Sequence, residues 1–450
     1  MTTTPLDRRT FVAPLLPVVG AATDVPLATG GTAAYANLDY AASAPALAGV
    51  QERVEQALPY YSSVHRGAGW LSQVSTRAYE AARRRIGRFL GARDDDVVVL
   101  TRNTTDALNL LASAVPAGAG DVLVLEIEHH ANLLPWLRLP HRVLAPSGTL
   151  ERTLDAIETA LRERPTALLA VTGASNVTGE ELPVARLADL AHTYGARIVV
   201  DAAQLAPHRR VDLAGSDLDY VALSGHKLYA PYGAGVLVGR RDWLDAAEPY
   251  LAGGGAVREV GLAEVRWAPA PARHEAGTPN VLGAVALAAA CEIVGSLPEG
   301  ALEVHEETLR SRLVEGLTHV DGVRVQRIWD DSPSTIGVVT FTVAGFDAGL
   351  VAAVLSAEHG VGVRDGKFCA HPLLARLGLD DGAVRASIGV GSCSDDVDRL
   401  LAGVRALVSD GPRLAYELVD GRWAPVGDTR TLPSWLDDEG PGAASPCQGA

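Results

Sequence analysis

The chain has 450 residues, of which 48% are hydrophobic and 21% are charged, as in a globular protein with a large domain and a smaller one. Its formal charge of −15 argues against a phosphate backbone as the main ligand, so we expect no nucleic-acid partner. No apolar run reaches the roughly 18 residues of a transmembrane helix, and we expect no membrane partner. The four cysteines lack CxxC spacing, which argues against a zinc site or a disulfide framework and favours the reducing cytoplasm.

After an irregular N-terminal arm, the pattern predicts helices over residues 45–58 and 72–90. From residue 95 onward, short apolar runs alternate with amphipathic segments. We predict strands at 97–100, 122–127, 167–171, 198–200 and 218–223, and helices at 106–115, 150–164 and 182–194. Strands that alternate with helices of this length pair in parallel through right-handed crossovers. We therefore predict an α/β fold whose mostly parallel sheet is covered by helices on both faces.

Polar side chains follow several of these strands directly, at the sheet edge where α/β folds bind ligands. Thr104 and Thr105 open a helix, where hydroxyls and free N–H groups either bind a phosphate or only cap the helix. His129 and His130 follow the next strand. No third ligand lies at helical spacing from them, so we expect no metal, and a flat imidazole can instead stack on a planar ring.

Two further residues sharpen this reading. Asp201 follows a buried strand, where an unpaired carboxylate is costly and a protonated ring nitrogen would be a suitable partner. Lys227 lies in the turn after the strand at 218–223, and a partly desolvated amine can form a Schiff base with an aldehyde. Taken alone, Lys227 would be a solvated loop lysine. Together with the hydroxyls and a histidine at neighbouring strand ends, these residues describe a pyridoxal phosphate site.

Five stretches resemble the class V aminotransferase superfamily, and within it the group II cysteine desulfurases and selenocysteine lyases. They are Glu128-His129-His130-Ala131-Asn132, Ser175-Asn176-Val177, Asp201-Ala202-Ala203-Gln204, Ser224-Gly225-His226-Lys227 and Glu275-Ala276-Gly277-Thr278-Pro279-Asn280. The resemblance covers about residues 35–408. It implies a fold-type I pyridoxal phosphate enzyme with a mostly parallel seven-stranded sheet and a smaller α+β C-terminal domain. It also implies a homodimer whose active sites lie at the subunit interface.

The resemblance assigns the cofactor contacts residue by residue. Lys227 carries the Schiff base, Asp201 pairs with the ring nitrogen, and Gln204 hydrogen-bonds the ring hydroxyl. His129 stacks on the ring and belongs to the catalytic set. The remaining contacts fall to Thr104, Thr105, Asn176, Ser224 and His226, and to Thr278 reaching in from the partner subunit.

The resemblance also assigns the substrate contacts. Cys369 is the nucleophile that accepts sulfur, and Arg385 forks onto the substrate carboxylate, a geometry that guanidinium supplies. The other substrate contacts are expected from Asn176, Arg364 and His65, the last near the partner's active site.

One stretch departs from the family pattern. Group II enzymes usually have Thr-Gly-His-His before the cysteine, whereas this chain has Asp365-Gly366-Lys367-Phe368. The change can alter the activation of Cys369, the substrate or the sulfur acceptor.

We expect a cysteine desulfurase that converts L-cysteine to L-alanine and leaves a persulfide on the enzyme for an acceptor protein. The alternatives are a C–S lyase, a selenocysteine lyase, an amino-acid epimerase or an aminotransferase. A non-catalytic protein with a decayed pocket is disfavoured because Lys227, Asp201 and Arg385 are all present.

The expected organisation has five parts. They are an N-terminal arm (1–34), a large cofactor-binding domain (35–294), a small C-terminal domain (295–409), an extension containing a hairpin (410–436) and a disordered tail (437–450).

Overall fold

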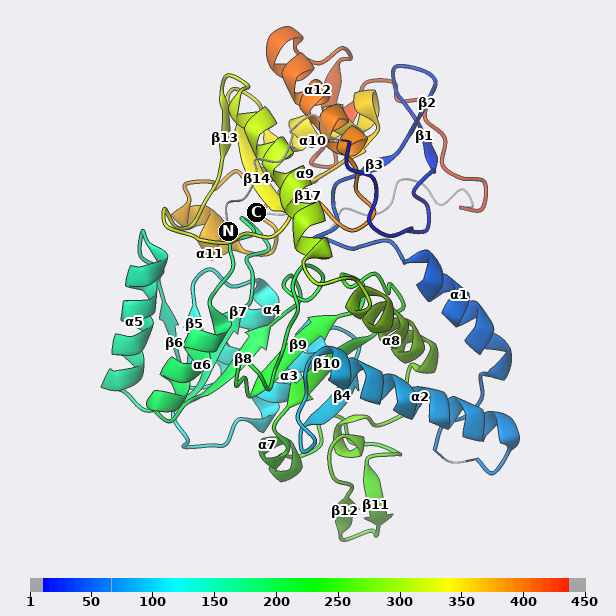
Figure 1. The fold of residues 1–450 in the computed structure, drawn as a ribbon, viewed down its shortest axis with the longest axis vertical. Coiled ribbons are helices and arrows are strands. Elements are labelled where there is room, and N and C mark those ends of the chain that lie inside the picture. The colour runs from blue at the N-terminus through cyan, green and yellow to red at the C-terminus, as the bar shows by residue number, and fades with distance from the viewer. Residues whose placement is uncertain (1–10, 66, 437–450) are drawn as a thin grey trace.

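The computed structural model describes residues 11–65 and 67–436, drawn as a ribbon in Figure 1. The expectations for residues 1–10 of the arm and for the tail at 437–450 lie outside the described residues. Within the described part of the chain, no helix is long and apolar enough to cross a membrane.

A seven-stranded sheet forms the centre of the molecule, with the strand order β4-β10-β9-β8-β7-β5-β6. Neighbours from β9 to β6 pair in parallel, and β10 runs antiparallel between β4 and β9. The prediction of a mostly parallel α/β sheet is therefore confirmed. The strands are β4 (Val97–Thr101), β5 (Asp121–Leu125), β6 (His141–Leu144), β7 (Thr166–Thr172), β8 (Arg197–Asp201), β9 (Tyr220–Ser224) and β10 (Gly235–Gly239).

Helices cover both faces of this sheet, because successive side chains of each strand point to opposite faces. In β7, Leu169 and Val171 pack into one core cluster, and Leu168 and Ala170 into another. The helices of this part are α1 (Ala48–Ala57), α2 (Trp70–Phe89), α3 (Thr104–Ala114), α4 (His130–Leu133), α5 (Leu150–Glu163), α6 (Val184–Thr193), α7 (Arg241–Ala246) and α8 (Val281–Gly295). Short 3-10 turns occupy Leu58–Tyr60, Trp136–Arg138 and Ala272–His274.

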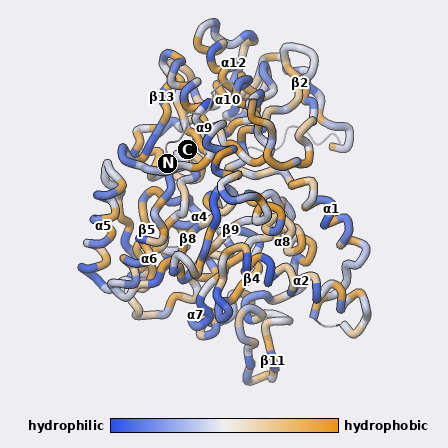
Figure 2. The backbone as a smooth tube through the Cα atoms, in the orientation of Figure 1, coloured by the Kyte–Doolittle hydropathy of each residue, from blue (hydrophilic) through white to orange (hydrophobic). Residues whose placement is uncertain are grey.

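The sequence explains the different surroundings of these helices. Helix α5 buries Leu150, Leu154, Ile157 and Leu161 along one stripe, as expected for a helix on the surface of a core. Helix α8 is hydrophobic over most of its length in Figure 2 and packs against α1 and α2, so it is covered on several sides.

A second, antiparallel sheet lies above the first in Figure 1, with the order β13-β14-β17-β16. Its strands are β13 (Val323–Val325), β14 (Val338–Val343), β16 (Arg364–Gly366) and β17 (Ala383–Ser387). A separate core cluster joins these strands to the helices α9 (Ala301–Thr318), α10 (Ala348–His359) and α12 (Ser394–Asp410). The short helix α11 (His371–Arg376) follows the loop that carries Cys369.

Small sheets complete the fold. In the arm, β1 (Asp24–Pro26) pairs with β2 (Thr32–Ala34). After the arm, β3 (Ala36–Asn37) pairs in parallel with β15 (Val361–Gly362). The strands β11 (Val257–Val260) and β12 (Val265–Trp267) form a hairpin that projects at the bottom of Figure 1. The predicted C-terminal hairpin is present as β18 (Tyr416–Val419) and β19 (Arg422–Pro425). Its turn residues Asp420 and Gly421 both have positive φ, as a two-residue hairpin turn requires. The domain boundaries stay a prediction.

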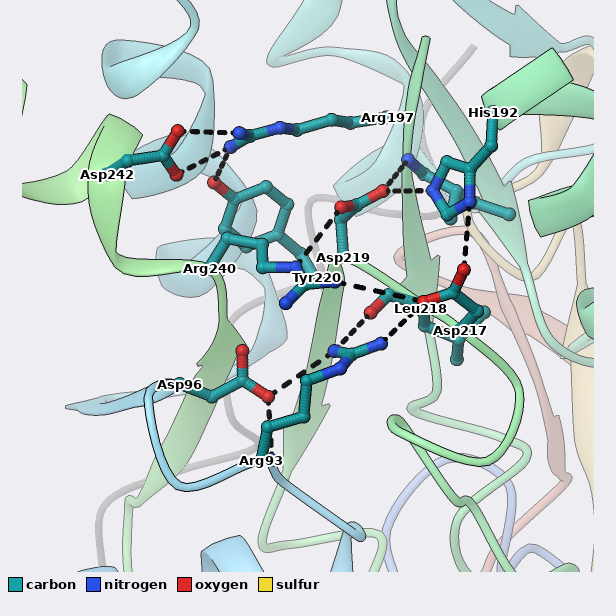
Figure 3. Close-up of polar contacts among 11 residues, drawn as sticks. Arg93, Asp96, His192, Arg197, Asp217, Leu218, Asp219, Tyr220, Arg240 and Asp242 are labelled. Atoms are coloured by element: carbon teal, nitrogen blue, oxygen red, sulfur yellow. Dashed lines mark hydrogen bonds and ion pairs between the residues drawn. The ribbon is translucent and has the colours of Figure 1, made fainter. Parts of the chain in front are cut away.

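Charged residues at the amino end of β9 fix the position of that strand (Figure 3). The buried carboxylate of Asp219 accepts hydrogen bonds from the backbone N–H of Ile198 at 3.0 Å and from His192 Nε2 at 2.8 Å. Arg93 donates to the backbone carbonyl of Leu218 at 2.9 Å. The register of β9 decides where its other end lies, and that end leads into the turn that carries Lys227.

Candidate active site

The predicted site residues converge on one cavity of about 350 Å³ at the carboxyl ends of the central strands. Only His65 and Thr278 among them lie elsewhere. The predicted residues in its lining are Thr104, Thr105, His129, Asn176, Asp201, Gln204, Ser224, His226, Lys227, Arg364, Cys369 and Arg385. They come from both halves of the fold, because the Arg364–Gly366 strand and β17 belong to the second sheet.

The first wall of the cavity is the N-terminus of α3. Asn103 caps this helix by accepting from the N–H of Asp106 at 2.9 Å, and Thr104 and Thr105 form its first turn. Ser224 Oγ, at the end of β9, lies 2.8 Å from both the backbone nitrogen and Oγ1 of Thr104. Hydroxyls beside the positive end of a helix make a site suited to a phosphate.

Gly235 in β10 is what allows the α3 N-terminus to approach the sheet so closely. A Cβ at this position would lie 2.5 Å from Asn103 Cα, so a larger residue would push the helix away. The glycine therefore holds the threonines next to Ser224.

Asp201 ends β8 with a buried side chain, and its Oδ1 accepts from the N–H of Ala203 at 2.9 Å. Burial raises the pKa of this carboxyl, while the hydrogen bond and the charge of Lys227 oppose that effect. Gln204, three residues after Asp201, donates from Nε2 to the carbonyl of Ala41 at 2.8 Å. A buried carboxylate of this kind gains from a cationic partner in the cavity.

Lys227 lies in the turn after β9, which is anchored by the hydrogen bond from the N–H of Gly225 to the carbonyl of Ala234 at 2.7 Å. Burial lowers the pKa of the Lys227 amine to about 8. The charge of Asp201 opposes this shift and that of Arg385 adds to it. The neutral amine is therefore accessible near neutral pH, as a nucleophilic or basic lysine needs.

His129 is the N-cap of α4, and its Nδ1 accepts from the N–H of Ala131 at 3.0 Å. Burial, followed by the charge of Lys227, lowers the pKa of His129 to about 3. The imidazole is therefore neutral, and the hydrogen bond at Nδ1 assigns its proton to Nε2. Burial likewise lowers the pKa of His226 to about 4.

The loop that carries Cys369 is held through its backbone. Phe368 and Cys369 both adopt left-handed backbone conformations, with φ of 52° and 53°. Asn176 Nδ2 donates to the carbonyl of Phe368 at 2.8 Å, and the N–H of His130 donates to the carbonyl of Cys369 at the same distance. A strained conformation persists where its surroundings enforce it, and here two segments after central strands do so.

Arg385 extends from β17 and is buried, with its guanidinium 5.1 Å from the centre of the Phe368 ring. Its Nη1 donates to the carbonyl of Asn176 at 2.9 Å, and its Nη2 donates to Asp39 Oδ1 at 3.1 Å. The buried Nε makes no hydrogen bond to any described residue. A buried N–H without a partner is costly, so an acceptor on a ligand at this position would be favourable.

Sequence reasoning did not select Asp39. The signal was present, because this aspartate directly follows the apolar residue of a short strand-like start, as Asp201 does. It was not selected because its partner, Arg385, lies 346 residues away in the chain.

His65 and Thr278 are exposed and lie outside the cavity lining. His65 Nε2 is 2.9 Å from Glu80 Oε1, and the His65 ring meets the edge of the Tyr79 ring. Their assignment to a partner subunit's site stays a prediction. The described residues hold no group of histidine, cysteine or acidic side chains arranged to bind a metal.

The sheet order and the lysine-containing cavity define an α/β enzyme of the aminotransferase type. Residues 36–400 match the family model of class V aminotransferases, and the chain belongs to this family. Members of the family are pyridoxal phosphate enzymes. The matched region ends before the C-terminal hairpin.

Several relatives carry the name cysteine desulfurase. The cysteine desulfurase of Dickeya dadantii is 38% identical to this chain, and the match covers 83% of this chain and 92% of the relative. The probable cysteine desulfurase 2 of Mycobacterium leprae is 42% identical, and the match covers 77% of this chain and 85% of the relative. Among solved structures, cysteine desulfurase CsdA from Escherichia coli is 35% identical with a TM-score of 0.74, covering 83% of this chain and 94% of its own. The apo cysteine desulfurase from Thermococcus onnurineus is 34% identical with a TM-score of 0.77, and the match covers 87% of this chain and 98% of that protein.

Proposed function

We propose that this protein is a pyridoxal phosphate-dependent cysteine desulfurase. It would remove sulfur from L-cysteine, release L-alanine and carry the sulfur as a persulfide on Cys369. One observation supports this proposal most: Lys227, Arg385 and Cys369 come from three separate segments and line the same cavity. A lysine, a carboxylate-binding arginine and a nucleophile are the three groups that this reaction needs.

The cavity fits the cofactor group by group. The α3 N-terminus with Thr104, Thr105 and Ser224 suits the phosphate, since it offers hydroxyls and a positive helix end. The buried carboxylate of Asp201 suits a protonated ring nitrogen, and the neutral His129 offers a flat face. Gln204, Asn176 and His226 complete the proposed contacts. When bound, the cofactor stores the electron pair released at the substrate Cα.

Lys227 would hold the aldehyde carbon of the cofactor and later move the Cα proton. With a pKa of about 8, about a tenth of the amines are neutral at pH 7, which suffices for a base. Arg385 would bind the substrate carboxylate through its Nε, which has no partner among the described residues, and Arg364 also lines the cavity.

Cys369 would act as the nucleophile. Its thiolate attacks the substrate sulfur and forms an S–S bond while the substrate Cβ–S bond breaks. The electron pair of the broken bond stays with the substrate carbon, where a proton completes L-alanine. Asn176 and His130 hold the loop so that Cys369 stays at the cavity during this step.

We further propose a homodimer in which His65 and Thr278 approach the partner's cavity. Both are exposed and outside their own cavity, and the exposed Tyr60 and Trp70 near His65 suit a buried interface. A cytoplasmic location and an acceptor protein for the sulfur complete the proposal. We also propose a large domain (35–294) and a small domain (295–409), because most residues of the core cluster around the second sheet lie in the latter, with Ala36 and Leu38 packing into it from the former.

The test is to offer L-cysteine to the holoenzyme and follow alanine, sulfide and pyruvate. Wild type should form alanine and Cys369→Ala should not. Cys393→Ala is the matched control, because Cys393 caps α12 outside the cavity lining, and it should behave as wild type. Pyruvate as the product, or equal turnover by Cys369→Ala, would establish a C–S lyase instead.

A further inference from the structure

The environment of Asp39 was not anticipated from sequence, and it places a carboxylate of the protein on the arginine proposed to bind substrate. Asp39 follows β3 and bridges to Ser387 in β17, and the N–H of Ala41 donates to Ser387 Oγ at 2.9 Å. These contacts lock the segment against β17, next to Arg385. Asp39 Oδ1 then lies 3.1 Å from Arg385 Nη2.

The donors of Arg385 are divided between three directions. Nη1 is committed to the carbonyl of Asn176, Nη2 to Asp39, and the buried Nε to no described residue. A carboxylate that forks onto a guanidinium along its Nε edge uses Nε and Nη2 together. A bound substrate carboxylate would therefore share Nη2 with Asp39, and two carboxylates would meet at one guanidinium.

Building on the proposed function, we propose that Asp39 is a resident counter-carboxylate. It keeps the buried Arg385 neutralised and aimed in the free enzyme, and it takes up a proton when the substrate carboxylate arrives. Asp39 is thus a positioning residue that acts through Arg385. An unpaired buried guanidinium is costly, which is the physical reason for a resident partner.

The charges around Asp39 set the direction of this response. Burial raises the pKa of Asp39. The positive charges of Arg385 and Arg364 oppose this rise, and the negative charge of Asp365 adds to it. Tyr35 also faces Asp39, and burial and then the charge of Asp39 raise the pKa of its phenol. A second carboxylate at Arg385 repels the first and raises the pKa of Asp39 further, so ligand binding draws in a proton.

The direction in which affinity changes with pH follows from the difference in the pKa of Asp39 between the free enzyme and the complex. Asp39 binds its proton more tightly in the complex than in the free enzyme. Affinity for a carboxylate ligand is therefore highest below the pKa of Asp39 in the free enzyme. It falls as pH rises through that value, by up to about tenfold per pH unit, until the pKa in the complex is reached.

The decisive experiment is calorimetric titration of the holoenzyme with L-alanine in buffers of different ionisation enthalpy. L-Alanine carries the carboxylate and amine but no sulfur, so the measurement does not depend on turnover. The amine of L-alanine and Lys227 exchange protons in every variant, so the comparison is between variants: wild type should bind more protons on titration than Asp39→Asn does. Asp39→Glu restores the carboxylate and should restore uptake, while Asp398→Asn, which pairs with Arg312 outside the cavity lining, is the matched control and should keep it. Equal uptake by wild type and Asp39→Asn would overturn the proposal.

A second readout separates positioning from a merely structural role. As pH rises through the pKa of Asp39 in the free enzyme, the wild-type Kd for L-alanine should rise relative to that of Asp39→Asn, which should be lower at the alkaline end. If the Kd of Asp39→Asn is higher than that of wild type at every pH and depends on pH in the same way, Asp39 has only a structural role. If the holoenzyme shows the proton uptake but forms no alanine from L-cysteine, the proposed reaction fails while this inference stands.

Discussion

Replacing Arg385 by lysine keeps the positive charge but removes the planar fork. Arg385 has two partners in the protein, since Nη1 donates to the carbonyl of Asn176 and Nη2 donates to Asp39. Its buried Nε has no partner among the described residues, and we propose that the substrate carboxylate supplies one. The single ammonium of a lysine would keep its contact with Asp39 or serve the substrate, but not in the forked geometry. The change therefore removes at least one charge-assisted hydrogen bond to the substrate carboxylate.

Such a hydrogen bond contributes about 1.5–3 kcal/mol, which corresponds to roughly 10- to 150-fold in binding. We expect the KM of Arg385→Lys for L-cysteine to rise by that factor, with a smaller fall in kcat, because Lys227 and Cys369 are unchanged. Initial rates of alanine formation over a range of L-cysteine concentrations give both constants.

The matched control is Arg312→Lys. Arg312 also forks onto a carboxylate, that of Asp398 at 2.6 and 2.5 Å, but in the helix pair α9 and α12 away from the cavity. Its KM should equal that of wild type. A KM for Arg385→Lys within about twofold of wild type would refute the assignment of Arg385 to the substrate carboxylate.

Three further outcomes are expected. Lys227→Ala should bind the cofactor without a covalent bond and lose alanine formation, and a borohydride-fixed adduct in this variant would contradict the role of Lys227. Burial lowers the pKa of the Lys227 amine to about 8, and a base must be deprotonated to act. The wild-type kcat should therefore rise with pH through about 8 and level off above it. A kcat that does not change across that range would exclude Lys227 as the rate-determining base. Asp219→Ala should lower the free energy of unfolding by about 1–3 kcal/mol, since the buried N–H of Ile198 loses its acceptor. The exposed Asp217→Ala should cost under about 1 kcal/mol, and denaturant titration measures both. Equal losses in these two variants would contradict the structural role of Asp219.

Local sequence determined the architecture of this protein to a large extent. The alternation of apolar runs and amphipathic segments predicted the parallel sheet, because central strands such as β7 are buried on both faces and surface helices such as α5 on one stripe. The turn at Asp420 and Gly421 predicted a hairpin because both residues tolerate positive φ. Polar residues after the strands, such as Asp201 and Lys227, line the cavity because the carboxyl ends of parallel strands share one edge.

The predictions from sequence were less accurate at the ends of individual strands. The run before Lys227 was predicted as a strand from residue 218, whereas β9 begins at Tyr220. Asp219, just before that strand, instead turns its carboxylate to Ile198 and His192. Element boundaries depend on such contacts from distant segments, which periodicity does not contain.

Only the tertiary structure decided the electrostatics of the site. The pKa of Lys227 depends on its burial and on charges from Asp201 and Arg385, which no local pattern brings together. The pairing of Asp39 with Arg385 joins two ends of the chain across 346 residues. Residue type and spacing, together with the resemblance to a known family, thus predicted which groups reach the cavity. Burial and long-range contacts, which exist only in the folded chain, decided their charge states and hydrogen-bond partners.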